Sequence, residues 1–200
     1  MSVDYRLAPE NLFSACINDC KAAAKWLVNN AMKEFGTGKL FISGASAGGH
    51  LSAVNTLYIR DSLHAIDKVR GVNLMYGCFD LSGTPSCRMI TDSSFPPKKF
   101  IDDTWELAFH GWNQEQLRNP HYSPLYADLK NLPPALFTIG TIDPLIDDTY
   151  FMEARWRLAG NKTFLAVYPE CPHGFNFIPT QMASAANEKM FQWIISLCEK

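Results

Sequence analysis

The sequence predicts an α/β protein with a mainly parallel sheet and helices on both faces of that sheet. Short apolar segments with the composition of buried strands lie near residues 2–7, 39–44, 69–76, 135–140 and 163–168. Segments with apolar residues at helical spacing lie near residues 12–34, 47–60, 149–159 and 182–198. Strands that alternate with helices in this way are typical of parallel sheets with right-handed crossovers.

The length and composition fit one globular domain. The chain has 200 residues, of which 47% are hydrophobic, and it contains no internal repeat. We therefore expect a single domain over residues 1–200. A formal net charge of −2 without a basic run gives no electrostatic footprint for nucleic acid. No apolar run is long enough to span a membrane, and the sequence lacks the layout of a signal peptide, which favours the cytoplasm.

The most informative motif lies in residues 40–50, where an apolar strand, a serine flanked by glycines and the start of a helix follow one another. A serine on a sharp strand-to-helix turn has strained backbone angles. We expect a side chain at Gly44 or Gly48 to collide with the neighbouring backbone. The turn holds Ser46 Oγ at the carboxyl end of the sheet, and the helix start places the Ala47 N–H where it can stabilise an oxyanion.

A serine hydroxyl needs a base and an acid that orients the base, and after such a turn they follow in the order Ser, Asp or Glu, His. Asp143 follows the predicted strand at 135–140, and His173 follows the predicted strand at 163–168. Because the carboxyl ends of parallel strands meet at one edge of a sheet, we expect both side chains to lie near Ser46.

Other acids and histidines fit these roles less well. Asp80 is the best alternative acid because it also follows a predicted strand, whereas Asp147 and Asp148 have the position of helix caps. His50 lies one helical turn beyond Ser46, and we expect it to pack or bond locally. The histidines without a strand-end context are His64, His110 and His121.

Several motifs together resemble the hormone-sensitive-lipase-like esterases of the α/β-hydrolase fold. They are Val-Asp-Tyr-Arg-Leu-Ala-Pro-Glu at residues 3–10, Gly-Ala-Ser-Ala-Gly-Gly at 44–49, Ser-Pro-Leu at 123–125, Leu-Pro-Pro-Ala at 132–135, Asp-Pro-Leu-Ile-Asp at 143–147 and His-Gly-Phe at 173–175. The resemblance covers essentially the whole chain. It implies hydrolysis of small carboxylic esters, with Ser46 as nucleophile, Asp143 as orienting acid, His173 as base, and no metal or organic cofactor.

The sequence departs from this family in three places. Ala45 stands where the family often has an acidic residue, and Glu170-Cys171-Pro172 stands where many members have a glycine and apolar residues. The family's His-Gly-Gly-Gly motif, which supplies oxyanion-hole N–H groups, has no counterpart. Since residues 2–7 match the family's fourth strand, we expect a fold without the first strands and a weak catalyst.

The resemblance also implies that one edge of the sheet is open. In the family's strand order the third strand lies between the fourth and the fifth strand. The strand that precedes Ser46 is therefore expected to have an open apolar edge. Such edges pair with other chains, so we expect self-association through this edge.

The segment around residues 81–131 interrupts the alternation and is rich in proline, serine and aromatic residues. Two interpretations remain open: a lid or acyl pocket over Ser46, or ordinary core packing. The aromatic residues concerned are Phe95, Phe100, Trp105, Phe109 and Trp112.

The cysteines indicate buried reduced thiols rather than disulfides. Cys16 and Cys20 fall on an apolar stripe of the first predicted helix, together with Leu12, Ala23 and Leu27. No spacing of cysteine and histidine resembles a zinc site.

Three other functions remain alternatives to an esterase. A serine peptidase of the prolyl-oligopeptidase kind has the same serine turn and the same order of residues. A ligand-binding protein is the second, because the plant gibberellin receptor is built on this fold, although that receptor lacks the histidine that stands here at His173. A catalytically impaired fragment of an esterase is the third.

Overall fold

The computed structural model describes residues 1–198 and contains one parallel sheet of four strands in the order β1-β2-β3-β4. The strands are β1 (Leu40–Ala45), β2 (Val69–Met75), β3 (Ala135–Gly140) and β4 (Thr163–Tyr168). Each strand pairs in parallel with the next. The α/β class and the four strands predicted after residue 38 are therefore confirmed.

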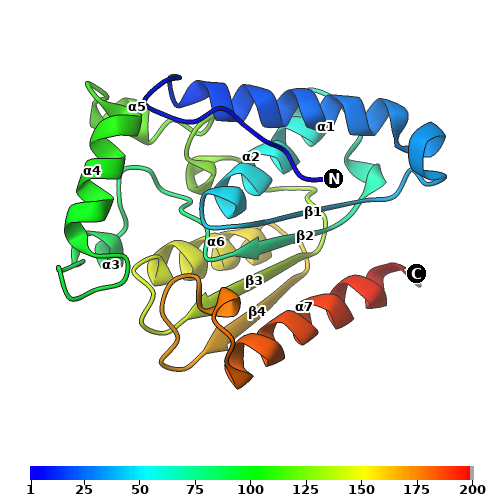
Figure 1. Cartoon of the computed structure of the whole chain (residues 1–200). Helices are drawn as coiled ribbons and strands as arrows, with labels where there is room; N and C mark the ends of the chain where they lie inside the picture. Colours follow the sequence, from blue (N-terminus) through cyan, green and yellow to red (C-terminus); the bar gives the residue numbers. More distant parts are fainter. Residues whose placement is uncertain (199–200) are drawn as a thin grey trace.

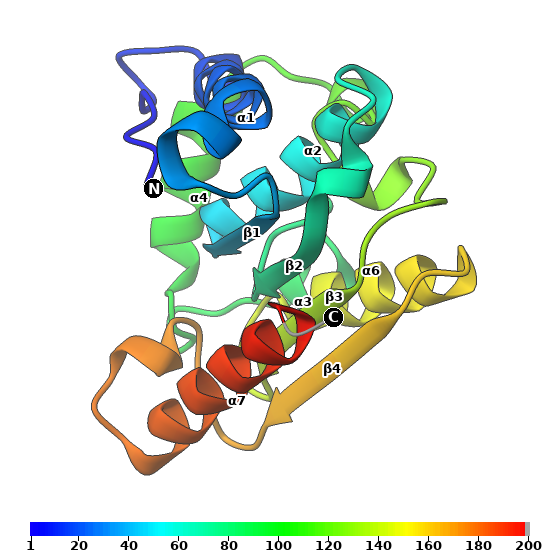
Figure 2. The ribbon, with the colours of Figure 1, turned by 90° about the vertical axis from the view of Figure 1, so that its right-hand side faces the viewer.

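Helices cover both faces of this sheet. The long helices are α1 (Ser14–Phe35), α2 (Ala47–Asp61), α4 (Lys98–Phe109), α6 (Ile146–Leu158) and α7 (Gln181–Cys198). Two helices of one turn are α3 (Pro85–Arg88) and α5 (Gln114–Leu117). Helices α2 and α6 lie on one face and α7 on the other, while α1 packs on α2 (Figures 1 and 2). Within residues 1–198, no helix is long and apolar enough to cross a membrane.

Alternate residues of the central strands build a core on each face. Val72 and Phe137 face α2 and α6, where they pack with the fully buried Trp156. On the other face, Leu136 packs with Trp193 of α7. All residues of β3 are buried, which explains its uninterrupted apolar sequence. Each fully buried large side chain contributes roughly 1.5–3 kcal/mol to stability.

Residues 2–7 do not form the predicted strand. They run along α1 in an extended conformation without a ladder partner, and Val3 and Tyr5 pack near Ile17 (Figure 1). Their other anchor is an ion pair between Arg6 Nη2 and Asp19 Oδ1 at 2.7 Å. The apolar pattern fitted a strand, but a strand also needs an adjacent backbone, and residues 2–7 pair with no strand in the described part of the chain.

The outer edge of β1 is open as expected. Within the described chain β1 pairs with β2 only. A cavity of about 360 Å³ lies along it, lined by residues of β1, α1, α2 and residues 1–5. Asn55 of α2 lines this cavity, and its buried Oδ1 has no hydrogen-bond partner among residues 1–198.

The buried stripe of α1 differs from the predicted one. Leu12 lies before the helix and is 84% exposed, and the buried positions include Ile17, Cys20 and Ala24. The predicted stripe was wrong at Leu12 because the helix begins at Ser14. Cys20 is a buried free thiol, whose pKa burial raises to about 11, and Cys16 is a half-buried free thiol. The burial of Cys20 agrees with the predicted apolar stripe, whereas Cys16 is only partly buried.

The segment at 81–131 stands at the carboxyl end of the sheet and holds α3, α4 and α5 (Figure 1). Its aromatic residues divide between the two interpretations. Trp105, Phe109 and Trp112 pack together with Phe13 and Tyr122 in one cluster, as core residues do. The two aromatic residues that remain largely exposed are Phe95 and Phe100.

Candidate active site

Ser46 occupies the sharp turn between β1 and α2. Its backbone angles are φ 56° and ψ −119°, and its N–H donates to the Met75 carbonyl of β2 at 3.0 Å. Such angles cost a non-glycine residue roughly 1–3 kcal/mol, and they persist only where the surrounding structure enforces them. The strained turn predicted from the serine motif is therefore present.

The two flanking glycines have different roles. A Cβ at Gly44 would lie 2.1 Å from the Gly48 carbonyl oxygen, so no side chain fits there. At Gly48 a Cβ would meet nothing within 4 Å, and the predicted collision at this position is wrong. The reason is that Gly48 borders the open cavity beside β1. Gly49 packs closely on Gly77. A Cβ at Gly49 would lie 3.0 Å from the Gly77 Cα.

The structure brings Ser46, His173 and Asp143 together at the carboxyl end of the sheet. His173 Nε2 lies 2.8 Å from Ser46 Oγ, and His173 Nδ1 lies 2.9 Å from Asp143 Oδ2. The Asp143 side chain is fully buried, and the His173 side chain is 15% exposed. Because a carboxylate only accepts hydrogen bonds, Nδ1 carries the proton and donates to Asp143. Nε2 of the neutral ring is then free to accept from the serine hydroxyl.

Close contacts between the two strand-end loops fix this geometry. Asp143 Oδ1 accepts from the Leu145 N–H at 2.8 Å, which leaves Oδ2 for the histidine. A Cβ at Gly140 would lie 1.9 Å from the Cys171 carbonyl oxygen, so only glycine lets the loops of Asp143 and His173 approach. Gly140 is not among the predicted site residues, although a glycine at the end of a buried strand indicates a close approach of another backbone.

The histidine loop contains two residues with left-handed backbone angles. Gly174 has φ 73°, which glycine adopts without penalty, and Glu170 has φ 55°, which is unfavourable for a residue with a side chain. The Glu170 N–H donates to Thr141 Oγ1 at 2.8 Å and so ties this loop to the loop of Asp143. Glycine would adopt this φ at residue 170 without that penalty.

The alternative acid, Asp80, is bound elsewhere. It is buried, and its carboxylate accepts from Ser82 and from the Tyr126 hydroxyl at 2.9 Å. These contacts fasten the start of the inserted segment, and no hydrogen bond joins Asp80 to His173 within the described residues.

The interpretation of Asp147 and Asp148 as helix caps is wrong. Both lie in the first turn of α6, but they bind the loop that follows β2 instead of capping the helix. Asp147 Oδ2 accepts from the Ser86 N–H at 2.7 Å. Asp148 accepts from the N–H groups of Phe79 and Asp80 and, at 2.6 Å, from the Thr84 hydroxyl. Burial raises the pKa of Asp148 to about 6 despite these hydrogen bonds.

His50 bonds to the backbone of Tyr122, which is distant in the sequence, and not to a local partner as predicted. Its Nε2 lies 2.6 Å from the Tyr122 carbonyl oxygen, and since a carbonyl only accepts, Nε2 carries the proton. Burial lowers the pKa of His50, which keeps the ring neutral.

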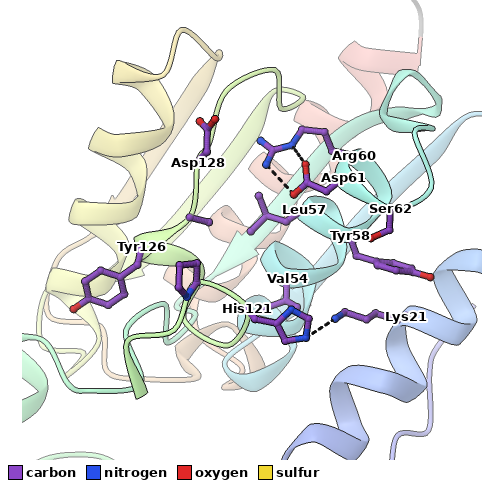
Figure 3. A pocket seen from close by; sticks show the side chains of 12 residues that line it. Lys21, Val54, Leu57, Tyr58, Arg60, Asp61, Ser62, His121, Tyr126 and Asp128 are labelled. Carbon is purple, nitrogen blue, oxygen red and sulfur yellow. Dashed lines mark hydrogen bonds and ion pairs between the residues drawn. The ribbon is translucent and has the colours of Figure 1, made fainter. Parts of the chain in front are cut away.

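His121 lines a separate pocket that is formed by α2, residues 120–128 and Lys21 of α1. There its Nε2 meets Lys21 Nζ at 3.0 Å (Figure 3). His64 and His110 are exposed at the surface. None of these three histidines has a hydrogen bond to Ser46 in the part of the chain described here.

The start of α2 presents backbone donors beside Ser46. The first N–H groups of an α-helix have no intrahelical acceptor, and Ala47 is the first residue of α2. The Ala47 N–H is thus available for negative charge that develops next to Ser46 Oγ. Among residues 1–198, no group of three or more His, Cys, Asp or Glu side chains gathers as a metal site requires.

The comparisons with known proteins agree with this fold. A family model described as alpha/beta hydrolase fold matches residues 1–177. The chain belongs to the α/β-hydrolase family. Among curated proteins, the carboxylic ester hydrolase LipN of Mycobacterium tuberculosis is 32% identical over 180 residues, which are 88% of this chain and 48% of LipN.

Solved α/β-hydrolase structures superpose on most of the chain. An esterase of Pyrobaculum calidifontis matches with a TM-score of 0.85 at 30% identity. The match covers 98% of this chain and 64% of the esterase chain. A hormone-sensitive lipase from a metagenome library matches with a TM-score of 0.84 at 30% identity. The match covers 96% of this chain and 65% of the lipase chain. The predicted resemblance to hormone-sensitive-lipase-like esterases is thereby confirmed. The chain spans about half the length of the curated relatives it matches.

Proposed function

We propose that this α/β-hydrolase chain hydrolyses small carboxylic esters through a covalent acyl-enzyme. The observation that carries the proposal is the position of His173 between Ser46 Oγ and Asp143 Oδ2, at 2.8 Å and 2.9 Å. Three residues from three strand-end loops in this order form the arrangement that activates a serine. Relatives named carboxylic ester hydrolase, carboxylesterase and acetyl esterase support an ester as the substrate.

In the proposed mechanism His173 Nε2 takes the proton of Ser46 as Oγ attacks the ester carbonyl. Asp143 holds the Nδ1–H tautomer and stabilises the imidazolium that forms. The Ala47 N–H donates to the oxyanion of the tetrahedral intermediate. His173 then gives its proton to the leaving alcohol, and water repeats the same steps on the acyl-enzyme.

In this proposal the Ala47 N–H is one donor of the oxyanion hole, and loss of one such donor typically lowers turnover by about 10²–10³. In the same proposal, the inserted segment at 81–131 forms part of the pocket wall, since it stands at the strand ends where Ser46 lies (Figure 1).

A fluorophosphonate probe tests the nucleophile independently of turnover. We expect one adduct, mapped by peptide mass to Ser46, and no adduct in Ser46→Ala. Ser62→Ala, at an exposed serine just beyond α2, is the matched control and is expected to label fully. An adduct at another serine, or full labelling of Ser46→Ala, would refute the assignment.

Paired substrates then separate the candidate activities. We expect turnover of nitrophenyl acetate and none of a dipeptide amide. The opposite pattern would favour a serine peptidase. Labelling at Ser46 without any ester turnover would identify an impaired esterase.

A further inference from the structure

Tyr76, the residue that follows β2, packs directly on His173. Its ring is edge-to-face on the imidazole, with centroids 4.8 Å apart and an interplanar angle of 65°. Tyr76 itself is 1% exposed, so the contact is fully enclosed. Two hydrogen bonds hold the imidazole nitrogens, and contact with the Tyr76 ring further restricts rotation about the side-chain bonds of His173.

The backbone of Tyr76 is held in an unfavourable conformation. Its φ is 36°, in the left-handed region where a bulky residue is an outlier. Its N–H donates to the Thr138 carbonyl oxygen of β3 at 2.8 Å, which anchors the residue to the centre of the sheet. Backbone strain of this kind persists where the surroundings enforce it, and it is concentrated at functional sites. The strain here directs the aromatic ring toward the histidine.

The Tyr76 hydroxyl binds the loop that follows His173. It donates to Oδ1 of Asn176, which lies in the short 3-10 helix Phe175–Phe177 just after the histidine. Asn176 Nδ2 in turn donates to Asn187 Oδ1 of α7 at 3.3 Å, and Asn187 Nδ2 donates to the Asn176 carbonyl oxygen at 3.1 Å. This chain of contacts ties the histidine loop both to β2 and to α7.

The hydroxyl keeps its proton under ordinary conditions. Burial, together with the nearby charge of Asp143, raises the pKa of Tyr76. The phenol therefore stays neutral and remains a donor to Asn176 near neutral pH.

We infer that Tyr76 is a positioning residue for the histidine base, whose ring fixes the rotation of the His173 imidazole and whose hydroxyl fixes the loop that carries it. The inference rests on the proposed ester hydrolysis, because it assigns His173 the role of base. Tyr76 does not touch the reacting atoms and acts only through His173 and Asn176.

Substitutions separate the ring from the hydroxyl. Tyr76→Leu removes both, and we expect kcat per active site to fall roughly 10²-fold with KM nearly unchanged, as small misplacements of a catalytic group do. Tyr76→Phe keeps the ring, and we expect it to recover most of that loss. Tyr76→Met, which keeps volume without a ring, replaces Tyr76→Leu if that variant does not fold. Active sites are counted by fluorophosphonate labelling, so a loss of folded protein does not lower the measured kcat.

Tyr168 provides the matched control. It is another buried tyrosine at the same end of the sheet and packs on Phe175 of the same loop, with ring centroids 5.2 Å apart. Among the described residues Tyr76 stacks on His173 and Tyr168 does not. We expect Tyr168→Leu to lower stability but to leave kcat per active site within about 3-fold, because only contact with the imidazole affects its orientation.

Nuclear magnetic resonance of the imidazole gives a readout that needs no turnover. We expect a slowly exchanging His173 Nδ1–H signal in the wild type, Tyr76→Phe and Tyr168→Leu, and its loss in Tyr76→Leu. If the wild type hydrolyses no ester, the proposed function fails while this spectrum still decides the role of Tyr76. An unchanged Nδ1–H signal in Tyr76→Leu, or equal losses of kcat in Tyr76→Leu and Tyr168→Leu, would overturn the inference.

Discussion

His173 Nδ1 lies 2.9 Å from Asp143 Oδ2, and the Asp143 side chain is entirely buried. A buried carboxylate that also accepts from the Leu145 N–H cannot turn away from the ring. The imidazole is therefore held as the tautomer that leaves Nε2 open toward Ser46. Asp80 follows the neighbouring strand, but its carboxylate is committed to Ser82 and Tyr126.

Exchanging each acid for its amide distinguishes these two carboxylates. We expect Asp143→Asn to fold and to lower kcat by about 10⁴, the loss seen when a triad aspartate becomes an amide that holds the wrong tautomer. Asp80→Asn is the control, and we expect it to reduce stability more than kcat. Rates with nitrophenyl acetate and urea unfolding of both variants measure the two effects. The reverse result would assign the orienting role to Asp80.

The two glycines of the serine motif give a paired test of the turn. In Gly44→Ala the new Cβ would lie 2.1 Å from the Gly48 carbonyl oxygen, and we expect overpacking to cost at least the usual ~1–3 kcal/mol. In Gly48→Ala the Cβ enters open space inside a helix, and we expect stabilisation by about 0.4–1 kcal/mol. Urea unfolding of both variants measures the difference. Equal destabilisation by both would contradict the cavity that the structure has beside Gly48.

Local patterns were sufficient to predict the four paired strands and the residues of the candidate site. Each strand that carries a site residue is a short apolar run, and its loop begins where that run ends. Because parallel strands end at one edge, knowing that Ser46, Asp143 and His173 each follow a strand was enough to place them together.

The errors concern features that depend on distant parts of the chain. Residues 2–7 have the composition of a strand, but their conformation depends on whether another backbone lies beside them. Gly48 borders a cavity that no local pattern reveals. Asp148 has the position of a cap, and it binds Phe79 and Thr84 instead because the loop after β2 folds over α6.

The buried His50 predicts a loss of stability in acid. The pKa of His50 in the folded protein lies below its unfolded value of ~6.5 because burial disfavours the charged ring. Below that pH the unfolded chain binds the proton more readily, so stability is fully present above about pH 6.5 and falls as the pH drops.

Replacing His50 by a residue that does not titrate tests this pH dependence of stability. We expect the free energy of unfolding to change less between pH 7 and pH 5 in His50→Gln than in the wild type. His64→Asn, at an exposed histidine with φ 49°, is the control and is expected to keep the wild-type slope. Urea unfolding at several pH values gives the slopes. An identical slope in His50→Gln would show that His50 does not titrate as proposed.

The open edge of β1 leads to a prediction about self-association. Within the described residues β1 pairs on one side only, and an apolar cavity borders its other side. Unpaired N–H and C=O groups on a strand edge pair readily with the edge of another molecule. We therefore propose that two or more copies of this chain associate through β1, and we expect the sedimentation coefficient to rise with protein concentration.

A lysine on this edge is expected to prevent that association. Phe41 is half-buried on β1, and in Phe41→Lys the aliphatic part of the side chain can still cover Gly71 while the charge extends into solvent. Leu158→Lys changes the charge equally at a residue that is 80% exposed at the end of α6, and Phe164→Lys places a charge on β4, the opposite edge strand. We expect Phe41→Lys alone to remain monomeric at concentrations where the wild type associates. A monomeric wild type, or dissociation by Phe164→Lys instead, would show that β1 is not the contact. An equal effect of Leu158→Lys would show that net charge alone prevents association.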